Sequence, residues 1–496
     1  MASHIDLCEK EQKIRNLLVE YCHHYDSHLS KTKENEEPLV LRITGGWVRD
    51  KLLGLGSNDL DIAVNKLTGL EFAEGLKQYI ADNSEKFGLE PRNVHKIEKN
   101  PEKSKHLETA TTQLYGLDVD FVNLRSEEYA GDSRIPQMKF GTPSQDAYRR
   151  DATLNALFYN LQEQKVEDFT GKGMDDLKNG VLRTPLSPFE TFHDDPLRVL
   201  RLIRFSATFG FKIAAEAIQA MQNPDIKLAL IRKISRERVG VEVSKLLAGK
   251  YAFLGLQHIQ GLKLEDAIFH LFDGYKPLSG FVYPESNLEA AISNVNLVLV
   301  NRPKLPTPMR NVMESSKSMS LLWLAAILSR WTGINAIEKN KEIPAVIIIV
   351  REGLKLPVND GKLVARLHQV QPEVAHAAKH TKELSRKQLG VLIRKCGEHW
   401  PLALTYSLVN EGAKHLDRYI NLVKAIETNS LQEAWALRPL VNGKEIQQAF
   451  EIKKGGPWLA KAVEMVIEYQ LENPAASKSD CLDYITSQKD GLLAQN

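Results

Sequence analysis

The stretch Arg42–Asn65 constrains the fold more than any other part of the chain. It reads RITGGWVRDKLLGLGSNDLDIAVN, in which an apolar run ends in two glycines and a second apolar run begins with Asp-Leu-Asp. A run of this kind predicts a strand over Leu39–Ile43, a glycine turn and a helix over Val48–Leu53. A second strand should then start at Asp59.

The two glycines and the arginine after them are suited to binding phosphate. Glycine has no side chain, so the backbone at Gly45 and Gly46 can approach an anion closely and offer its N–H groups. Arg49 falls near the start of the expected helix, where negative charge is favoured. A glycine pair alone more often marks only a turn, so this interpretation depends on the residues downstream.

Two aspartates open the second expected strand. Side chains two residues apart in a strand point to the same face, so Asp59 and Asp61 lie side by side while Leu60 faces the core. Two carboxylates this close repel each other unless a cation lies between them, and Mg²⁺ prefers carboxylate and phosphate oxygens. An Asp-x-Asp pair alone is more often a solvated strand end. Combined with the glycine turn and the arginine, it predicts a site for a nucleoside triphosphate and Mg²⁺.

This combination at this spacing resembles the first motif of the DNA polymerase beta-like nucleotidyltransferases. The form Gly-Gly-x-Val-Arg-Asp followed by Asp-x-Asp is similar to that of the class II tRNA nucleotidyltransferases, the CCA-adding enzymes, and of the bacterial poly(A) polymerases. The resemblance implies that Asp59 and Asp61 bind the metal and are catalytic. It also implies that Gly46 and Arg49 bind the nucleotide.

A second motif lies at Asp146–Asn160, which reads DAYRRDATLNALFYN. Its apolar residues recur at helical intervals, so we expect one helix across the whole stretch, with Asp151 and Asn155 one turn apart. The pattern Arg-Arg-Asp-x-x-x-Asn resembles the second motif of the family. The resemblance implies that Arg150, and less directly Asn155, reach the ribose and triphosphate of the incoming nucleotide. The alternative is a pair of surface arginines on a helix.

A helix rich in arginine is expected within Phe192–Phe211. Asp194 is placed to cap it or to lie in its first turn, and a proline follows at a position that helices accept. Three arginines then recur every three residues, and Val199, Ile203 and Ala207 form a separate apolar face. An exposed basic stripe is the alternative to a functional one. The arginines are Arg198, Arg201 and Arg204.

The start of this helix resembles the base-selecting motif Glu-Asp-x-x-Arg of class II CCA-adding enzymes, with Asp194 in place of the glutamate. Asp195 can accept a hydrogen bond from the amino group of cytosine or adenine, and Arg198 can donate to the neighbouring ring acceptors. Guanine and uracil place a carbonyl where the amino group must be, which leaves the carboxylate unpaired at about 1–3 kcal/mol or more. The resemblance also implies that Arg201 and Arg204 steady the helix and the triphosphate.

Three further segments carry weaker signals. Asp118 and Asp120 share one face of an expected strand. The superfamily often has a third carboxylate on a strand here, so the resemblance makes Asp120 a candidate metal ligand; the alternative is a polar sheet edge. Ser126–Pro143 has little pattern and is expected to be a mobile loop, which in the family helps to switch addition from C to A. Ser235 is placed to cap a helix, on which we expect a structural ion-pair role for Glu242.

Composition argues against a polybasic protein, a membrane-spanning protein and one held together by zinc or disulfides. The 496 residues include 65 Lys and Arg against 63 Asp and Glu, so nucleic-acid contacts must come from local patches. No apolar run has transmembrane length, and no signal or transit peptide is recognised. The cysteines lack the paired spacing of zinc ligands or disulfides, which suits a reducing compartment. They are Cys8, Cys22, Cys396 and Cys481.

We therefore expect an α+β fold, with a polymerase-beta-like head of mixed β-sheet and helices followed by an all-α neck, body and tail. The expected divisions are a leading helix and linker, the catalytic head, a neck that carries the base-selecting helix, a helical body and a helical tail. In that order they span residues 1–37, 38–165, 166–255, 256–430 and 431–496.

The resemblance implies template-independent addition of CCA to the 3′ end of tRNA from CTP and ATP, in a protein of eukaryotic, fungal style. The cofactor would be Mg²⁺, acting as two ions. The partners would be the tRNA acceptor arm and the two nucleotides, with no membrane, and we expect a monomer in the cytoplasm and nucleus, with the mitochondrion as a further compartment. Two alternatives are a poly(A) polymerase of the same superfamily and a catalytically inactive tRNA-binding protein.

Overall fold

The computed structural model describes residues 5–29, 37–57, 59–97, 109–128, 137–271, 275–277 and 282–494. The chain divides into two compact units, Met1–Ile268 and Phe269–Asn496, and each is described by itself. Within the described residues, no helix has the length and apolar character needed to cross a membrane.

A seven-stranded mixed sheet forms the centre of the first unit, in the order β3-β4-β5-β2-β1-β8-β9. Strands β2 and β5 are parallel, and the other neighbouring pairs are antiparallel. This arrangement confirms the predicted α+β head. The strands are β1 (Leu41–Thr44), β2 (Asp59–Val64), β3 (His95–Ile97), β4 (Thr109–Leu114), β5 (Leu117–Asn123), β8 (Leu157–Asn160) and β9 (Lys165–Asp168).

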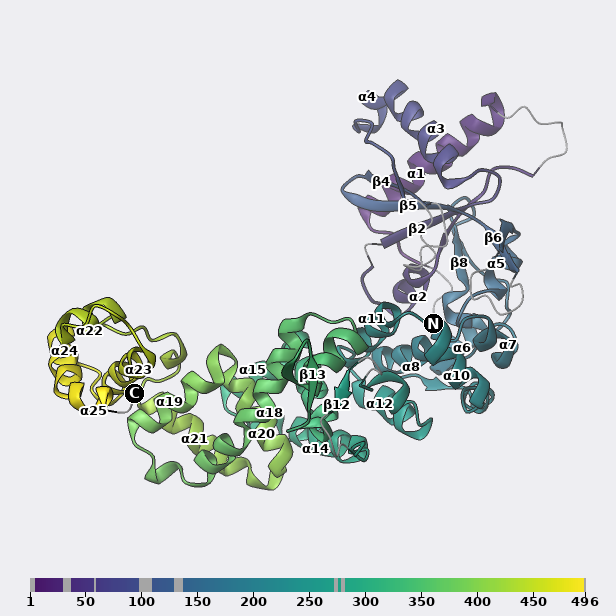
Figure 1. The fold of residues 1–496 in the computed structure, drawn as a ribbon. Helices are drawn as coiled ribbons and strands as arrows, with labels where there is room; N and C mark the ends of the chain where they lie inside the picture. Colours follow the sequence, from purple (N-terminus) through teal and green to yellow (C-terminus); the bar gives the residue numbers. More distant parts are fainter. Residues whose placement is uncertain are drawn as a thin grey trace. The chain divides into compact units, whose positions relative to one another are not determined.

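The two faces of this sheet differ in character. Val119 and Phe121 of β5 are fully buried and alternate with aspartates, and Phe121 contacts Phe72 of α3 with ring centroids 4.9 Å apart. Figure 1 shows α1 and α3 above β2 and β5, with α2 below them. The aspartates therefore lie on the face that α3 does not cover. The helices of this part are α1 (Glu9–His24), α2 (Gly46–Leu52), α3 (Gly69–Asp82), α4 (Ser84–Phe87) and α5 (Pro143–Tyr148).

Helices make up most of the remainder of the first unit. The apolar face predicted for the arginine-rich helix is buried, with Val199, Ile203 and Ala207 at most 1% exposed, where α8 packs against α11 and α12. The elements are α6 (Gly173–Asn179), β10 (Val181–Leu182), α7 (Pro188–Asp194), α8 (Leu197–Phe209), β11 (Lys212–Ile213), α9 (Ala215–Met221), α10 (Pro224–Lys233), α11 (Arg236–Leu247), α12 (Ala252–Gly261) and α13 (Glu265–Ile268).

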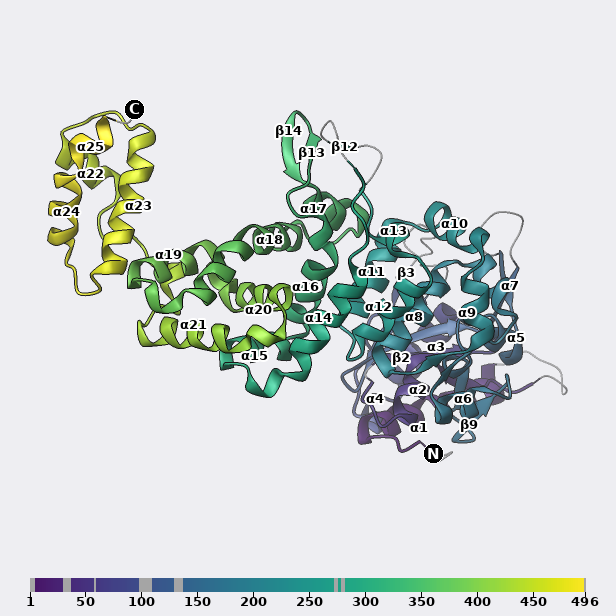
Figure 2. The same cartoon turned by 90° about the horizontal axis from the view of Figure 1, so that it is seen from below.

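The second unit is helical apart from a small sheet, β12-β13-β14. Figure 2 shows α18 and α20 alongside each other, in agreement with their packing contact. Its elements are β12 (Lys276–Pro277), α14 (Leu288–Val300), α15 (Thr307–Glu314), α16 (Ser316–Ile327), β13 (Asn335–Glu338), β14 (Lys341–Pro344), α17 (Ala345–Ile348), α18 (Val358–Lys379), α19 (Arg386–Cys396), α20 (Trp400–Glu411), α21 (Leu416–Thr428), α22 (Gly443–Phe450), α23 (Pro457–Glu472), α24 (Lys478–Ser487) and α25 (Lys489–Leu493).

The structure corrects three local predictions. The single helix expected over Asp146–Asn160 is wrong, because α5 ends at Tyr148 and Leu157–Asn160 forms strand β8 between β1 and β9. All four residues of β8 are buried, and a strand covered on both faces has no alternation that separates it from a buried helix.

The segment Ser126–Pro143 is not the patternless loop that we predicted. Its described residues contribute to two antiparallel strands, β6 (Arg125–Glu128) and β7 (Gln137–Phe140), and residues 129–136 lie outside the described part. Asp194 is also misplaced by the prediction, since it ends α7 and does not begin α8. Pro196 takes the capping position of α8 because the break between the two helices falls at Asp195.

Candidate active site

Three carboxylates meet on the exposed face of the sheet. Strands β2 and β5 pair in parallel with Asp61 opposite Asp120, so the two side chains share one face. Asp59 completes the group, and one carboxylate oxygen from each of Asp59, Asp61 and Asp120 lies within 4.8 Å of the other two. The structure thus places the third candidate carboxylate with the predicted pair.

The charge in this cluster is concentrated. Burial raises the pKa of Asp61 to about 6, with further contributions from Asp59 and Asp120 and an opposing one from Arg150. The hydroxyl of Thr111 donates to Asp120 Oδ1 at 2.6 Å and orients that carboxylate. Oxygen ligands held this close favour a hard cation such as Mg²⁺, so the donor set fits the predicted metal.

The glycine turn lies directly beside this cluster. Gly45 has φ +77°, a backbone conformation that L side chains rarely adopt. A Cβ at Gly45 would lie 3.6 Å from Asp61 Oδ2 and 3.7 Å from Arg150 Nη1. The bare backbone therefore runs between a carboxylate of the cluster and a guanidinium group, as a phosphate site requires.

Arg150 is held in place by several acceptors. Its guanidinium donates to Asp146 Oδ2 at 2.7 Å, to the hydroxyl of Thr44 and to the carbonyl of Asn155 at 3.2 Å. Burial alone would raise the pKa of Asp146, but Arg150 and Arg149 lower it to about 2. The arginine is thus fixed beside Gly45 although the helix predicted to carry it is absent.

Arg49 is almost fully enclosed by neighbouring side chains. It is 9% exposed, donates to the side chain of Asn155 and pairs with Asp50 at 2.8 Å. Its guanidinium also lies over the ring of Phe209, 4.7 Å from the centroid. Asn155 donates in turn to Asp151 at 2.9 Å. Arg49 and Asn155 therefore join α2 to the segment after α5, and their roles at the nucleotide stay predictions.

The two residues expected to read the base lie at the junction of α7 and α8. Asp195 pairs with Arg238 of α11 at 2.8 Å and accepts a hydrogen bond from the backbone N–H of Leu197 at 3.2 Å. Arg198 is 8% exposed and donates to the carbonyl of Arg149 at 2.7 Å. This bond places α8 next to the segment that carries Arg150.

The other two arginines of α8 are engaged by carboxylates. Arg201 pairs with Asp151 at 2.6 Å and with Glu242 at 3.6 Å, and Arg204 also pairs with Glu242. Asp151 raises the pKa of Arg201, and Arg201 keeps the pKa of Asp151 low against the effect of burial. The predicted structural role of Glu242 and the helix-steadying role of these arginines are consistent with this network. Contact of Arg201 and Arg204 with the triphosphate stays a prediction.

Sequence reasoning missed several residues that shape the site. Thr44 and Thr111 hold Arg150 and Asp120, yet a threonine in a strand gives no signal of function before the strand pairing is known. Arg238 pairs with Asp195 across about 40 residues of sequence, a contact that no local pattern indicates. Ser235 occupies the predicted capping position of α11, although its side chain makes no capping hydrogen bond.

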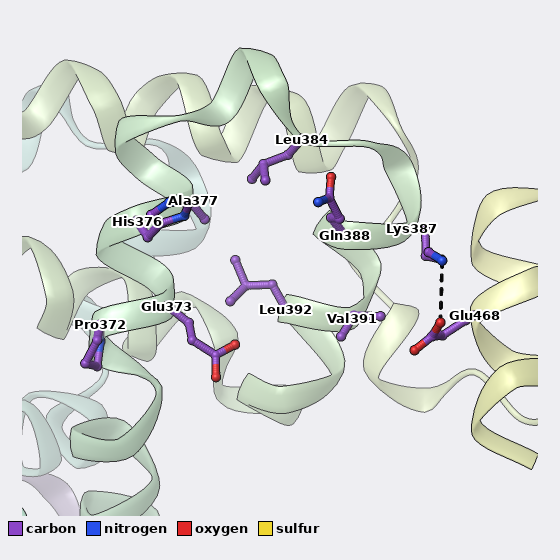
Figure 3. A pocket seen from close by; sticks show the side chains of 10 residues that line it. All are labelled: Pro372, Glu373, His376, Ala377, Leu384, Lys387, Gln388, Val391, Leu392 and Glu468. Carbon is purple, nitrogen blue, oxygen red and sulfur yellow. Dashed lines mark ion pairs between the residues drawn. The ribbon is translucent and has the colours of Figure 1, made fainter. Parts of the chain in front are cut away.

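The second unit contains a cavity of about 510 Å³, shown in Figure 3. Helices α18, α19 and α23 contribute its lining, which is largely apolar around Leu384 and Leu392. Lys387 and Glu468 form an ion pair across one side, at 3.5 Å. These features do not match a triphosphate and metal site, whereas the carboxylate cluster of the first unit has ligands that fit one.

A mixed sheet with carboxylates on two adjacent strands, next to a glycine turn and a fixed arginine, defines a nucleotidyltransferase of the polymerase-beta-like class. Residues 41–183 match the family model described as the poly A polymerase head domain. Residues 210–274 match the model described as the probable RNA and SrmB-binding site of polymerase A.

Full-length relatives narrow this class to one family. The mitochondrial CCA tRNA nucleotidyltransferase of Candida glabrata is 42% identical, over 98% of this chain and 97% of the relative. That of Saccharomyces cerevisiae is 41% identical, over 98% and 94%. A solved structure of a CCA-adding enzyme in an apo form has the same fold, with a TM-score of 0.64, 20% identity and 96% of both chains covered. The chain belongs to the CCA tRNA nucleotidyltransferase family, which confirms the predicted resemblance and enzyme class.

Proposed function

We propose that this protein adds CCA to the 3′ end of tRNA, using CTP and ATP and releasing pyrophosphate. The observation that carries the proposal is the cluster of Asp59, Asp61 and Asp120 beside Gly45 and Arg150, in a chain of this family. Degenerate carboxylates would have favoured a protein that only binds tRNA. The cluster is complete, so transfer is favoured over binding alone.

The three carboxylates would hold two Mg²⁺ ions, which when bound lower the pKa of the attacking hydroxyl and neutralise charge on the triphosphate. The backbone at Gly45 and Gly46 would bind phosphate oxygens, because no side chain blocks their approach. Arg150, held by Asp146, would donate to the phosphates from a fixed position. Arg49 would act mainly through the position of α2.

Base choice would depend on Asp195 and Arg198. An ionised carboxylate offers about four lone-pair positions, and the partners of Asp195 leave some of them available to a base amino group. A guanidinium has five N–H donors, so the bond from Arg198 to a backbone carbonyl does not exhaust it. The pair can therefore accept cytosine or adenine, whereas guanine and uracil would leave the carboxylate facing a carbonyl.

The proposal also covers the roles of the other parts of the chain, the oligomeric state and the cellular compartment. The segment 166–255 would be the neck between the head at 38–165 and a tRNA-binding body and tail at 256–430 and 431–496. The two strands around residues 126–140 would take part in the change from C to A addition. We propose a monomer that acts in the cytoplasm and nucleus and also in the mitochondrion, the compartment in the names of the two fungal relatives.

Single-nucleotide transfer tests this proposal. Three tRNA transcripts, ending before CCA, after C and after CC, would each be incubated with Mg²⁺ and one of the four triphosphates. We expect addition of C, C and A in turn and then no further addition. Asp59→Ala should abolish transfer while tRNA binding persists. Repeated addition of A to any RNA end would instead identify a poly(A) polymerase, and binding without transfer by the unmodified protein would identify a tRNA-binding protein.

A further inference from the structure

A row of polar side chains crosses the sheet from the carboxylate cluster to its outer strand. Asp61 on β2 lies opposite Asp120 on β5, Asp120 lies opposite Thr111 on β4, and Thr111 lies opposite His95 on β3. Directly opposed residues point to the same face of a sheet. The exposed face that carries the carboxylates therefore continues, without interruption, to His95.

A surface cavity of about 360 Å³ covers the outer end of this row. The hydrogen bond from Thr111 to Asp120 joins the cavity to the carboxylate cluster. The cavity thus borders the reaction centre, on the side of Asp120. Its lining includes Arg92, Asn93, His95, Thr111, Gln113 and Asp118.

The cavity offers a positive group to an anion. Arg92 is exposed and forms no ion pair with any residue that the structure describes. His95 is exposed beside it, and the single carboxylate in the lining, Asp118, accepts a hydrogen bond from Gln113 at 3.3 Å. A guanidinium at the edge of a polar cavity is a common partner of a phosphate group.

The order of the strands decides which phosphate could bind there. Gly45 and Arg150 lie on the β1 side of Asp61, whereas Asp120, Thr111 and His95 lie on the β5 side, as the order β3-β4-β5-β2-β1 requires. In an in-line transfer, the attacking and leaving oxygens lie on opposite sides of the reacting phosphorus. If the triphosphate occupies the Arg150 side, the RNA hydroxyl must approach from the side of Asp120.

We propose that Arg92 and His95 form a subsite for the RNA 3′ end, in which Arg92 binds the phosphodiester that precedes the terminal nucleotide. Two strand spacings, about 10 Å, separate His95 from the strand of Asp120. The sugar and 5′ phosphate of one nucleotide, together with an arginine side chain, can span this distance. The inference rests on the proposed function, because it takes the carboxylate cluster as the point of attack.

A paired change in protein and RNA tests the contact. The substrates are a tRNA transcript that lacks CCA and the same RNA with an uncharged methylphosphonate at its last internucleotide linkage. Arg92→Ala should lower kcat/KM for the native RNA about tenfold, with KM for CTP unchanged. The methylphosphonate should cause a similar loss in the unmodified enzyme and no additional loss in the variant. Lys165→Ala, on β9 at the opposite edge of the sheet, is the matched control and should not differ from the unmodified enzyme.

The salt dependence of kcat/KM provides a second test, because it would not change if Arg92 had only a structural role. Loss of one contact to single-stranded RNA phosphate should reduce the slope of log kcat/KM against log salt concentration by about 0.7. Additive losses from Arg92→Ala and the methylphosphonate would overturn the inference, as would an increase in KM for CTP alone or no change at all. Asp61→Asn is assayed in parallel, since retained transfer in this variant would show that the carboxylate cluster is not the point of attack. Absence of C and A addition by the unmodified enzyme would instead show that the proposed function itself is wrong.

Discussion

Glu11→Gln should loosen the attachment of the N-terminal helix α1 to α2, the helix that begins at the glycine turn. Glu11 is 5% exposed and accepts hydrogen bonds from Trp47 Nε1 at 3.1 Å and from the backbone N–H of Cys8 at 2.8 Å. It also pairs with Lys51 at 2.7 Å. Trp47 and Lys51 both belong to α2, so one carboxylate joins the leading helix to the helix beside the reaction centre.

The expected loss of stability in Glu11→Gln follows from the burial of the ion pair. Breaking a buried ion pair costs about 3–5 kcal/mol, whereas an exposed pair contributes about 0–1 kcal/mol. The side chains of Glu11 and Lys51 are 4% and 18% exposed, and glutamine retains an oxygen for Trp47, so we expect a loss of about 1–3 kcal/mol. Glu9→Gln is the matched control in the same helix. Glu9 and its partner Lys13 are 82% and 54% exposed, so this change should have no measurable effect.

Hydrogen exchange of the full chain, resolved by peptide, measures this difference where it arises. A loss of about 1–3 kcal/mol corresponds to exchange that is about 5- to 150-fold faster in peptides from α1 and α2. Burial opposes the effect of Lys51, but the pKa of Glu11 is lowered on balance. Its contribution should therefore be present above the usual carboxyl pKa and decline as the pH falls below it. Equal exchange in Glu11→Gln and Glu9→Gln at neutral pH would refute the reasoning.

Substitutions at three other sites, two of them with a control variant, test separate parts of the structure. Gly45→Ala and Gly54→Ala both place alanine at positive φ, which should lower the free energy of unfolding by about 1–2 kcal/mol each. Only at Gly45 does the new Cβ lie beside Asp61 and Arg150, so kcat/KM for CTP should fall about tenfold or more in this variant and less than about twofold in Gly54→Ala. Arg238→Leu removes the ion-pair partner of Asp195, so kcat/KM for CTP and discrimination against UTP should both fall. Arg238→Lys should restore part of the loss. An unchanged ratio of kcat/KM for UTP to that for CTP would contradict a role for the pair in base choice. Burial lowers the pKa of His368 to about 4, so the unfolded chain binds more protons than the folded chain between about pH 6.5 and 4. The free energy of unfolding of the second unit should therefore fall by about 1.4 kcal/mol per pH unit on acidification through this range. Urea unfolding at several pH values should show a weaker dependence in His368→Gln.

The local features of the site could be predicted because they depend on residues close in sequence. The strand, glycine turn, helix and second strand between residues 41 and 64 follow from short-range patterns, and Asp59 and Asp61 share a face by strand geometry alone. The sequence left two interpretations of Asp120, a metal ligand or part of a polar sheet edge, for a physical reason. Its place beside Asp61 depends on the pairing of β2 with β5, and sequence periodicity does not specify which strands are neighbours.

The errors arose where long-range contacts override local pattern. The apolar residues of β8 recur at spacings that also suit a helix, but the backbone of this segment pairs with β1 on one side and β9 on the other. The strands β6 and β7 have only four residues each, and β6 carries no apolar side chain, so it is their pairing with each other that reveals them. The outer row from Asp120 through Thr111 to His95 likewise exists only through the register of three strands.

The segment from Arg149 to Asn155 connects helix α8, which we propose reads the base, with the glycine turn, which we propose binds phosphate. Helix α8 reaches it through Arg198, which donates to the carbonyl of Arg149, and through the pair of Arg201 with Asp151. Helix α2 reaches it through the bond from Arg49 to Asn155, and Arg150 extends from the same segment to Gly45. Because a turn and a short 3₁₀ helix, Thr153–Asn155, replace the predicted α-helix here, these neighbouring residues can point toward different elements. One short piece of backbone therefore holds both α8 and the glycine turn beside the carboxylate cluster, and we expect a displacement at either to move the other.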